Sequence, residues 1–230
     1  MRVVLFGATG MIGSGVLLEC LDDPRIETVI SVVRRPSGVT HAKLRELVHD
    51  DFLDYVPICA EFAGVDACLF CLGVSSAGMN EADYRRVTYD FTLAAAKEIL
   101  AESPHATFCY VSGAATDGTG RGRVMWARVK GQTENALLAM GFRSAFMFRP
   151  GYIQPMRGVR SKTALYQMVY TLAGPLYPLM HLLVPSYVTT TVDLAHAMIE
   201  AAGRGYERQV LETPDINRLA QQYDARRPAA

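Results

Sequence analysis

A glycine-rich stretch at residues 6–13, within RVVLFGATGMIG, constrains the fold of this chain more than any other feature. An apolar run precedes it and another follows it, which is the pattern of a buried strand that turns directly into a helix. Gly7 permits a sharp turn, Gly10 lets a ligand approach the backbone, and Gly13 lets the helix lie close to the strand. The stretch predicts a phosphate-binding loop, with an ordinary glycine turn as the alternative.

The rest of the chain alternates short apolar runs with longer helical patterns. We expect strands at residues 2–6, 28–33, 44–48, 67–72, 107–112, 144–149 and 208–213, and helices from the glycines to about 21, at 80–102, at 124–140 and at 191–202. Strands that are apolar throughout are typical of a parallel sheet buried on both faces. The fold class is therefore α/β, a Rossmann-type doubly wound parallel sheet with a small C-terminal helical cap.

The expected division of the chain is a dinucleotide-binding core over residues 1–150, a substrate-side cap with a closing helix and strand over 151–215, and a loose polar tail over 216–230. Residues 163–192 contain no Asp, Glu, Lys or Arg. We interpret this segment as two short helices that pack over the cleft or against a second subunit of a homodimer. A peripheral membrane contact is the alternative, since prolines interrupt any spanning helix.

Composition excludes some function classes. Half of the residues are hydrophobic, and 23 basic residues balance 23 acidic ones, so no excess charge favours nucleic acid. The start of the chain lacks the pattern of a secretory signal, which predicts a cytoplasmic protein. Cys68 and Cys71 point to opposite faces of a strand, and the five histidines show no ligand spacing, so we expect no metal site.

The second expected strand ends at Arg34 and Arg35, where an NAD-specific site carries a carboxylate for the adenosine ribose. The guanidinium fork suits a 2′-phosphate, so NADP(H) is favoured and NAD(H) is the second choice; a solvated basic pair is the bland alternative. Asp51 and Phe52 either border the adenine or form a surface loop. From the glycine loop, the expected cofactor-binding residues are Gly7, Thr9, Gly10, Met11, Ile12 and Gly13.

Several ordered motifs together resemble the short-chain dehydrogenase/reductase superfamily. They are GATGMIG, CLG at 71–73, YVSGAA at 110–115, VKGQTE at 129–134, FRPG at 148–151 and TVDLAHAMIEA at 191–201. The resemblance covers nearly the whole chain, and it is greatest to the extended and atypical members described as nucleotide-sugar-epimerase-like or Tat-interacting-reductase-like. It implies that Leu72, Gly73, Lys130, Pro150 and Gly151 also contact the cofactor.

The resemblance further implies catalytic roles. Ser112 orients a substrate carbonyl, or is a turn-forming serine; Lys130 holds the nicotinamide ribose, or is a surface lysine. The family's proton-donating tyrosine, four residues before the lysine, is replaced by Trp126. An indole N–H donates a hydrogen bond but does not exchange its proton near neutrality, as a tuned phenol does. Tyr152, just after the RPG sequence, is a substitute donor or a packing residue.

Two function classes follow, with enzymatic turnover left open. The first is an NADP(H)-dependent oxidoreductase that acts on an unknown small, apolar or conjugated acceptor and takes the proton from elsewhere than a tyrosine. The alternative is a catalytically degenerate protein that binds NADP(H) and reports its redox state to a partner. A third interpretation is a membrane-surface protein that binds lipid through residues 165–184.

Overall fold

Seven parallel strands form the central sheet of the computed structural model, which describes residues 1–160, 174 and 177–226. The spatial order is β3-β2-β1-β4-β5-β6-β9. The strands are β1 (Arg2–Phe6), β2 (Thr28–Val33), β3 (Leu44–Val48), β4 (Ala67–Phe70), β5 (Thr107–Val111), β6 (Ser144–Arg149) and β9 (Val210–Glu212). The order reverses between β1 and β4, which places a crevice at the carboxyl ends of these two strands.

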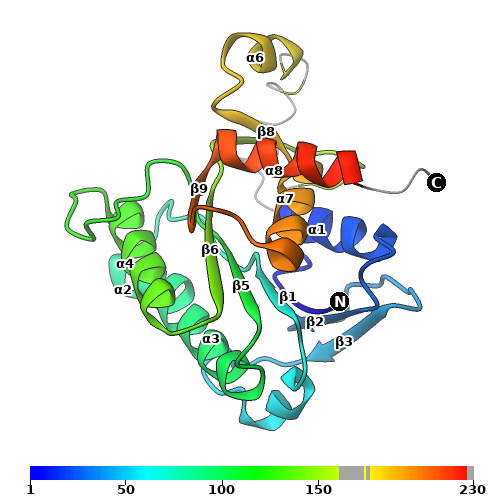
Figure 1. Ribbon diagram of the computed structural model, residues 1–230. Coiled ribbons are helices and arrows are strands. Elements are labelled where there is room, and N and C mark those ends of the chain that lie inside the picture. Colours follow the sequence, from blue (N-terminus) through cyan, green and yellow to red (C-terminus); the bar gives the residue numbers. More distant parts are fainter. Residues whose placement is uncertain (161–173, 175–176, 227–230) are drawn as a thin grey trace.

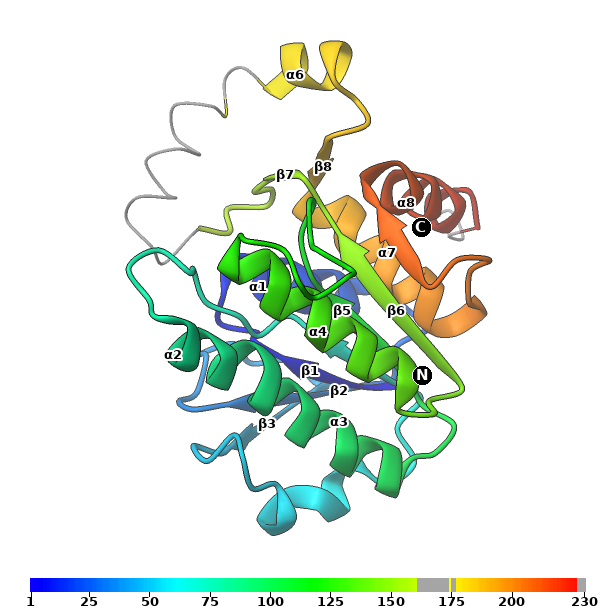
Figure 2. The same cartoon turned by 90° about the vertical axis from the view of Figure 1, so that its left-hand side faces the viewer.

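Helices cover both faces of the sheet (Figures 1 and 2). On one face lie α1 (Met11–Asp22), α7 (Thr191–Arg204) and α8 (Thr213–Arg226), and on the other lie α2 (Glu81–Arg85), α3 (Phe91–Glu102) and α4 (Met125–Ala139). A 3₁₀ helix (Val56–Phe62) precedes β4, and β7 (Tyr152–Gln154) pairs with β8 (Val188–Thr190) in a separate small sheet. The predicted doubly wound Rossmann fold is confirmed.

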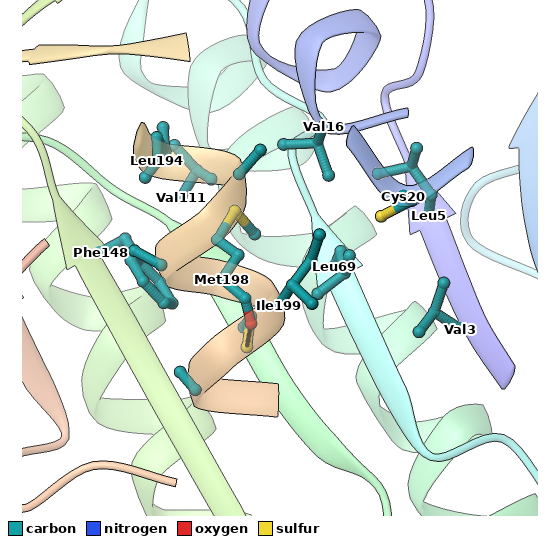
Figure 3. Packing of buried hydrophobic residues seen from close by; sticks show 14 of the residues in the cluster. Val3, Leu5, Val16, Cys20, Leu69, Val111, Phe148, Leu194, Met198 and Ile199 are labelled. Atoms are coloured by element: carbon teal, nitrogen blue, oxygen red, sulfur yellow. Dashed lines mark hydrogen bonds between the residues drawn. The ribbon is translucent and has the colours of Figure 1, made fainter. Parts of the chain in front are cut away.

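Strand residues alternate between two apolar cores. Val3 and Leu5 of β1 belong to the core beneath α1 and α7, whereas Val4 and Phe6 belong to the core beneath α3 and α4. Figure 3 shows the first of these, with Leu194, Met198 and Ile199 of α7 against side chains of the sheet and of α1. Burial on both faces explains why central strands such as β4 are apolar throughout.

The cysteines follow the same alternation. Cys68 is buried in one core, and Cys71 packs against the other, as the strand geometry predicts. All five thiols are free. Burial raises the pKa of the Cys20, Cys71 and Cys109 thiols well above the usual value. Across the described residues, no group of three or more His, Cys, Asp or Glu side chains is arranged to hold a metal ion.

The helix expected at residues 80–102 is interrupted. A π-helical turn, Arg86–Asp90, separates α2 from α3. Within it the carbonyl of Thr88 accepts a hydrogen bond from the Thr92 hydroxyl at 2.7 Å. Val87 of this turn and Phe91, the first residue of α3, line the cleft described below. Wider turns of this kind recur at functional sites.

The loose tail expected from residue 216 is wrong as far as Arg226. Residues 213–226 form α8, in which Ile216, Leu219 and Tyr223 are buried. The Tyr223 hydroxyl donates to Asp23 Oδ2 at 3.0 Å. The apolar residues at this helical spacing are few among many polar ones, so the sequence pattern resembled a tail. Residues 227–230 lie outside the described residues.

The expected division of the chain after residue 150 stays a prediction. The structure adds that α7 forms part of one core layer and that β9 joins the main sheet, so these elements belong to the sheet and its layers. Of the uncharged segment 163–192, residues 163–173 and 175–176 lie outside the described residues. In the remainder, α6 (Tyr177–Leu183) exposes Leu179, Leu182 and Leu183.

Candidate functional site

A cleft of about 750 Å³ opens at the carboxyl edge of the sheet, where the strand order reverses. The glycine loop and the start of α1 form its floor, and the ends of β2, β4 and β5 form its back wall. Val74, Val87 and Phe91 add apolar side chains to the lining. Ser112 from the end of β5 and Lys130 from α4 line it as well.

The glycine loop is held by contacts that only glycine permits at two of its positions. Gly7 has a φ of +82°, and a Cβ there would lie 2.6 Å from the amide nitrogen of Leu72. A Cβ on Gly13 would lie 2.0 Å from the carbonyl oxygen of Gly7. The first strand, α1 and the segment after β4 therefore meet at backbone distance.

Gly10 differs from these two glycines. A Cβ on Gly10 would meet only the Gly7 carbonyl oxygen at 3.4 Å, an ordinary contact, so the space above Gly10 is open cleft. Gly10 is also the N-cap of α1, whose first turn carries no acidic residue. The first amides of a helix lack intrahelical partners and carry partial positive charge. This cradle, which a methyl group would fill, fits a diphosphate.

The structure separates the two arginines at the end of β2. Both are exposed, but Arg34 lines the cleft and Arg35 lies outside its lining. The residues after β3 also differ in whether they line the cleft. Phe52 is 4% exposed and lines the cleft, whereas Asp51 lies outside and accepts a hydrogen bond from the Leu53 amide at 3.0 Å. Asp50 lines the cleft in the place expected for Asp51.

Ser112 and Lys130 are brought together at the other end of the cleft. The Ser112 hydroxyl lies 3.0 Å from Thr116 Oγ1, which donates to the carbonyl of Gly113 at 2.7 Å. Lys130 is half-buried, and its Nζ donates to the carbonyl of Val111 at 3.2 Å. Burial lowers the pKa of Lys130 to about 8, against the opposing effect of the Glu134 carboxylate.

Close packing holds Lys130 in place. A Cβ on the next residue, Gly131, would lie 1.7 Å from the carbonyl oxygen of Asp117, so α4 touches the loop after β5. That loop is closed by Asp117, whose carboxylate accepts from the amides of Arg121 at 3.0 Å and Thr119 at 3.0 Å. The hydrogen bond from the Thr119 hydroxyl, followed by those from the backbone amides, lowers the pKa of Asp117. The glycine in VKGQTE is thus needed for the position of its lysine.

Besides Arg35, Asp51 and Gly13, four more predicted residues lie outside the cleft lining of the described chain. Trp126 is half-buried one turn before Lys130, and its ring atom Cζ3 would lie 3.9 Å from a Cβ on Gly113. The Tyr152 hydroxyl donates to Gln154 Oε1 at 2.9 Å, and burial raises its pKa. The remaining two are Pro150, whose carbonyl accepts from the Ala114 amide at 2.9 Å, and Gly151, whose amide donates to Thr213 Oγ1 at 2.9 Å.

The other predicted contacts, Thr9, Met11, Ile12, Leu72 and Gly73, all line the cleft, while Gly13 is packed beneath it. Sequence reasoning missed Asp50, Ser75, Val87 and Phe91. Val87 and Phe91 fall within the helix expected at residues 80–102, and the spacing of apolar residues does not indicate the π turn found there. Asp50 is the sequence neighbour of Asp51, which was predicted. The sequence does not indicate which of the two side chains lines the cleft.

The fold of the chain resembles that of solved proteins. No family model matches the chain. The solved enzyme WbmF of Bordetella bronchiseptica in complex with NAD⁺ is 12% identical, with a TM-score of 0.66 over 100% of this chain and 79% of that one. A UDP-N-acetylglucosamine 4-epimerase from Methanobrevibacter ruminantium M1, in complex with UDP-N-acetylmuramic acid, is 16% identical, with a TM-score of 0.68 over 96% and 80%. The chain therefore shares the Rossmann fold of these two proteins.

Its curated relatives are fungal. Protein FMP52 of Meyerozyma guilliermondii is 23% identical over 233 residues, which cover 98% of both chains. Protein fmp52-1 of Aspergillus terreus is 29% identical over 165 residues, or 67% of this chain and 68% of the relative. Both are named as mitochondrial proteins. The expected cytoplasmic location is therefore wrong; the observation behind it, a missing secretory pattern, bears on secretion and not on mitochondria.

Proposed function

We propose that the cleft binds a nicotinamide dinucleotide, NADP(H) in preference to NAD(H), and that the chain uses it to reduce a small apolar or conjugated acceptor. The observation that carries the proposal is the cradle above Gly10, open to the cleft at the positive end of α1. Arg34 supports the NADP(H) preference from the end of β2. The dinucleotide supplies the hydride, and the chain's residues bind the dinucleotide, orient the acceptor and protonate it.

The apolar residues that line the cleft support the proposal of an apolar acceptor. These residues include Val74, Val87 and Phe91. In the described part of the chain no tyrosine lines the cleft, so the usual phenol of the family is missing from the site. Acceptors whose reduced form is a stabilised anion, such as quinones, flavins and enones, depend least on a strong local acid.

Replacing Arg34 with serine is expected to weaken NADPH binding about tenfold to a hundredfold, since one or two charge-assisted hydrogen bonds to the 2′-phosphate are lost. NADH binding should change little, because NADH lacks that phosphate. Fluorescence titration with both nucleotides measures the two affinities. Arg35→Ser is the matched control, because Arg35 is exposed and outside the cleft lining. An equal loss in the control, or an equal loss for NADH, contradicts the assignment.

Turnover separates the enzyme from the alternative, a degenerate NADP(H)-sensing protein. With saturating NADPH and a panel of quinones, flavins and enones, we expect oxidation of NADPH in step with reduction of at least one acceptor. Absence of turnover with all of them overturns the enzyme proposal.

The variant Trp126→Tyr tests the same distinction from within the chain. Trp126 lies one turn before Lys130 on α4, on the same helix face. A phenol there is expected to raise the reduction of simple carbonyls about tenfold or more, because general acids contribute about 10²–10⁴-fold when well placed. No gain in a stably folded variant favours the sensing protein.

The partners proposed for segment 163–192, a second copy of the chain or a membrane surface, stay proposals. Their support is the exposure of Leu182, 76%, and Leu183, 68%, on α6. No helix among the described residues is long and apolar enough to cross a membrane. Light scattering measures self-association, and co-sedimentation with liposomes measures membrane binding.

A further inference from the structure

Few groups that exchange protons line the cleft. Among its described lining residues these are Thr9, Arg34, Asp50, Cys71, Ser75, Ser112 and Lys130, and burial raises the pKa of the Cys71 thiol well above its usual value. Arg34 and Asp50 follow β2 and β3, on the side of the switch point that holds one half of a dinucleotide. On the other side, Ser75 follows β4, Ser112 follows β5 and Lys130 belongs to α4; Ser112 and Lys130 are next to each other through Val111. That end of the cleft therefore offers Ser112 and Lys130 together, and the Ser75 hydroxyl beside them in the lining.

The hydroxyl hydrogen of Ser112 is already used. Thr116 has a single hydroxyl hydrogen, which it donates to the Gly113 carbonyl at 2.7 Å. The 3.0 Å contact between Ser112 Oγ and Thr116 Oγ1 therefore has Ser112 as its donor. Ser112 is 8% exposed and presents lone pairs to the cleft. It accepts a hydrogen bond from a bound group and does not give a proton to it.

Lys130 is the group with hydrogens to spare. Of the three ammonium hydrogens, one is directed to the Val111 carbonyl at 3.2 Å. The Tyr110 ring lies beneath the ammonium, with its centroid 5.2 Å from Nζ, and gives it no acceptor oxygen. The nearest carboxylate on the same helix, Glu134, is held by Arg149 Nε at 3.0 Å. Within the described residues Lys130 forms no ion pair.

We propose that the Lys130 ammonium is the proton donor of this site, in place of the hydroxyl that a tyrosine would supply. The inference rests on the proposed function. When the acceptor gains a hydride from the reduced nicotinamide, a C–H bond forms and the electron pair of the acceptor's double bond moves to its far atom, an enolate oxygen for an enone. A Lys130 N–H bond breaks, its proton goes to that anion, and the neutral amine takes a proton from water.

The environment of Lys130 suits this role. Burial lowers the pKa of Lys130 to about 8, and the Glu134 carboxylate acts in the opposite direction. An acid with a pKa near the working pH gives its proton and is reprotonated with similar ease. Such an acid protonates an enolate or a hydroquinone anion readily and a simple alkoxide less so. The substrate class is therefore a conjugated carbonyl or quinone.

Two measurements test the inference. The first needs no turnover: the rate at which an amine-selective reagent labels Lys130 is followed against pH in the nucleotide-free protein, with exposed Lys97 as the internal control. We expect half-maximal labelling of Lys130 near pH 8. Equal pH dependence for the two lysines overturns the inference.

The second measurement compares Lys130→Arg with Lys97→Arg at saturating NADPH. Arginine keeps the positive charge and its hydrogen bonds but does not release a proton in this pH range. We expect NADPH affinity within threefold of the unaltered protein, and kcat lower by about 100-fold or more. Retained kcat in a variant that binds NADPH overturns the inference alone. Absence of turnover by the unaltered protein overturns the proposed function and the inference together.

Discussion

The variant Gly10→Ala is expected to fold normally and to lose nucleotide affinity by about a hundredfold or more. Its methyl group meets only the Gly7 carbonyl oxygen at 3.4 Å, so the loop and α1 stay as they are. The same methyl projects into the cradle where a diphosphate approaches the helix amides. Loss of one or two charge-assisted hydrogen bonds, at about 1.5–3 kcal/mol each, accounts for the reduced affinity. Titration with NADPH measures it.

The control for Gly10→Ala is Gly118→Ala, whose added methyl would lie 3.5 Å from Arg149 Nη2, outside the cleft lining. Thermal melts of both variants should match the unaltered protein. Gly13→Ala makes the opposite point, because a Cβ there would lie 2.0 Å from the Gly7 carbonyl oxygen and the fold itself should suffer. Normal NADPH binding by a folded Gly10→Ala variant contradicts the assignment of the loop.

Arg149→Met is expected to destabilise the protein by about 3 to 5 kcal/mol, because it strands a buried carboxylate. Arg149 joins the end of β6 to α4 through Glu134, whose side chain is 1% exposed, with Nη2 2.5 Å from Oε2 and Nε 3.0 Å from Oε1. For a chain of this size the melting temperature should fall by about 6 to 20 °C. Chemical and thermal unfolding measure the two quantities.

Two control variants show whether the loss of stability in Arg149→Met comes from the buried carboxylate: a double variant, and a variant of an exposed ion pair. Removing the stranded charge as well, in Arg149→Met with Glu134→Leu, should recover most of the stability, since an apolar pair of similar size often replaces a buried ion pair at little cost. Arg45→Met breaks the Arg45–Glu61 pair, in which Arg45 is 54% exposed, and should cost at most about 1 kcal/mol. Equal losses in Arg149→Met and Arg45→Met contradict the account.

The fold and the residues at the floor of the cleft could be predicted from the sequence. The glycine loop was predictable because its spacing, between an apolar strand and an apolar helix, admits few alternatives. The two cores were predictable because central strands such as β4 are apolar on both faces. The helix α8 was not, since only Ile216, Leu219, Ala220 and Tyr223 mark its buried side among polar residues.

The walls of the cleft were less predictable, because neighbouring residues of the same type differ in whether their side chains line the cleft. Nothing in the pair Arg34 and Arg35 says which one turns toward the cleft, and the same holds for Asp50 and Asp51. The commitment of the Ser112 hydrogen depends on Thr116, four residues away, through a loop whose path only the structure gives. A sequence pattern fixes which residues reach an edge of the sheet, and packing then selects those that face the ligand.

Equilibrium dialysis of the unaltered protein against NADPH, and separately against NADH, tests the central claim most directly. The claim is that the open amides of the Gly7–Gly13 loop hold a diphosphate. We expect one nucleotide bound per chain, with NADPH tighter than NADH. No binding of either nucleotide below about 1 mM, the upper end of ordinary substrate constants, contradicts it.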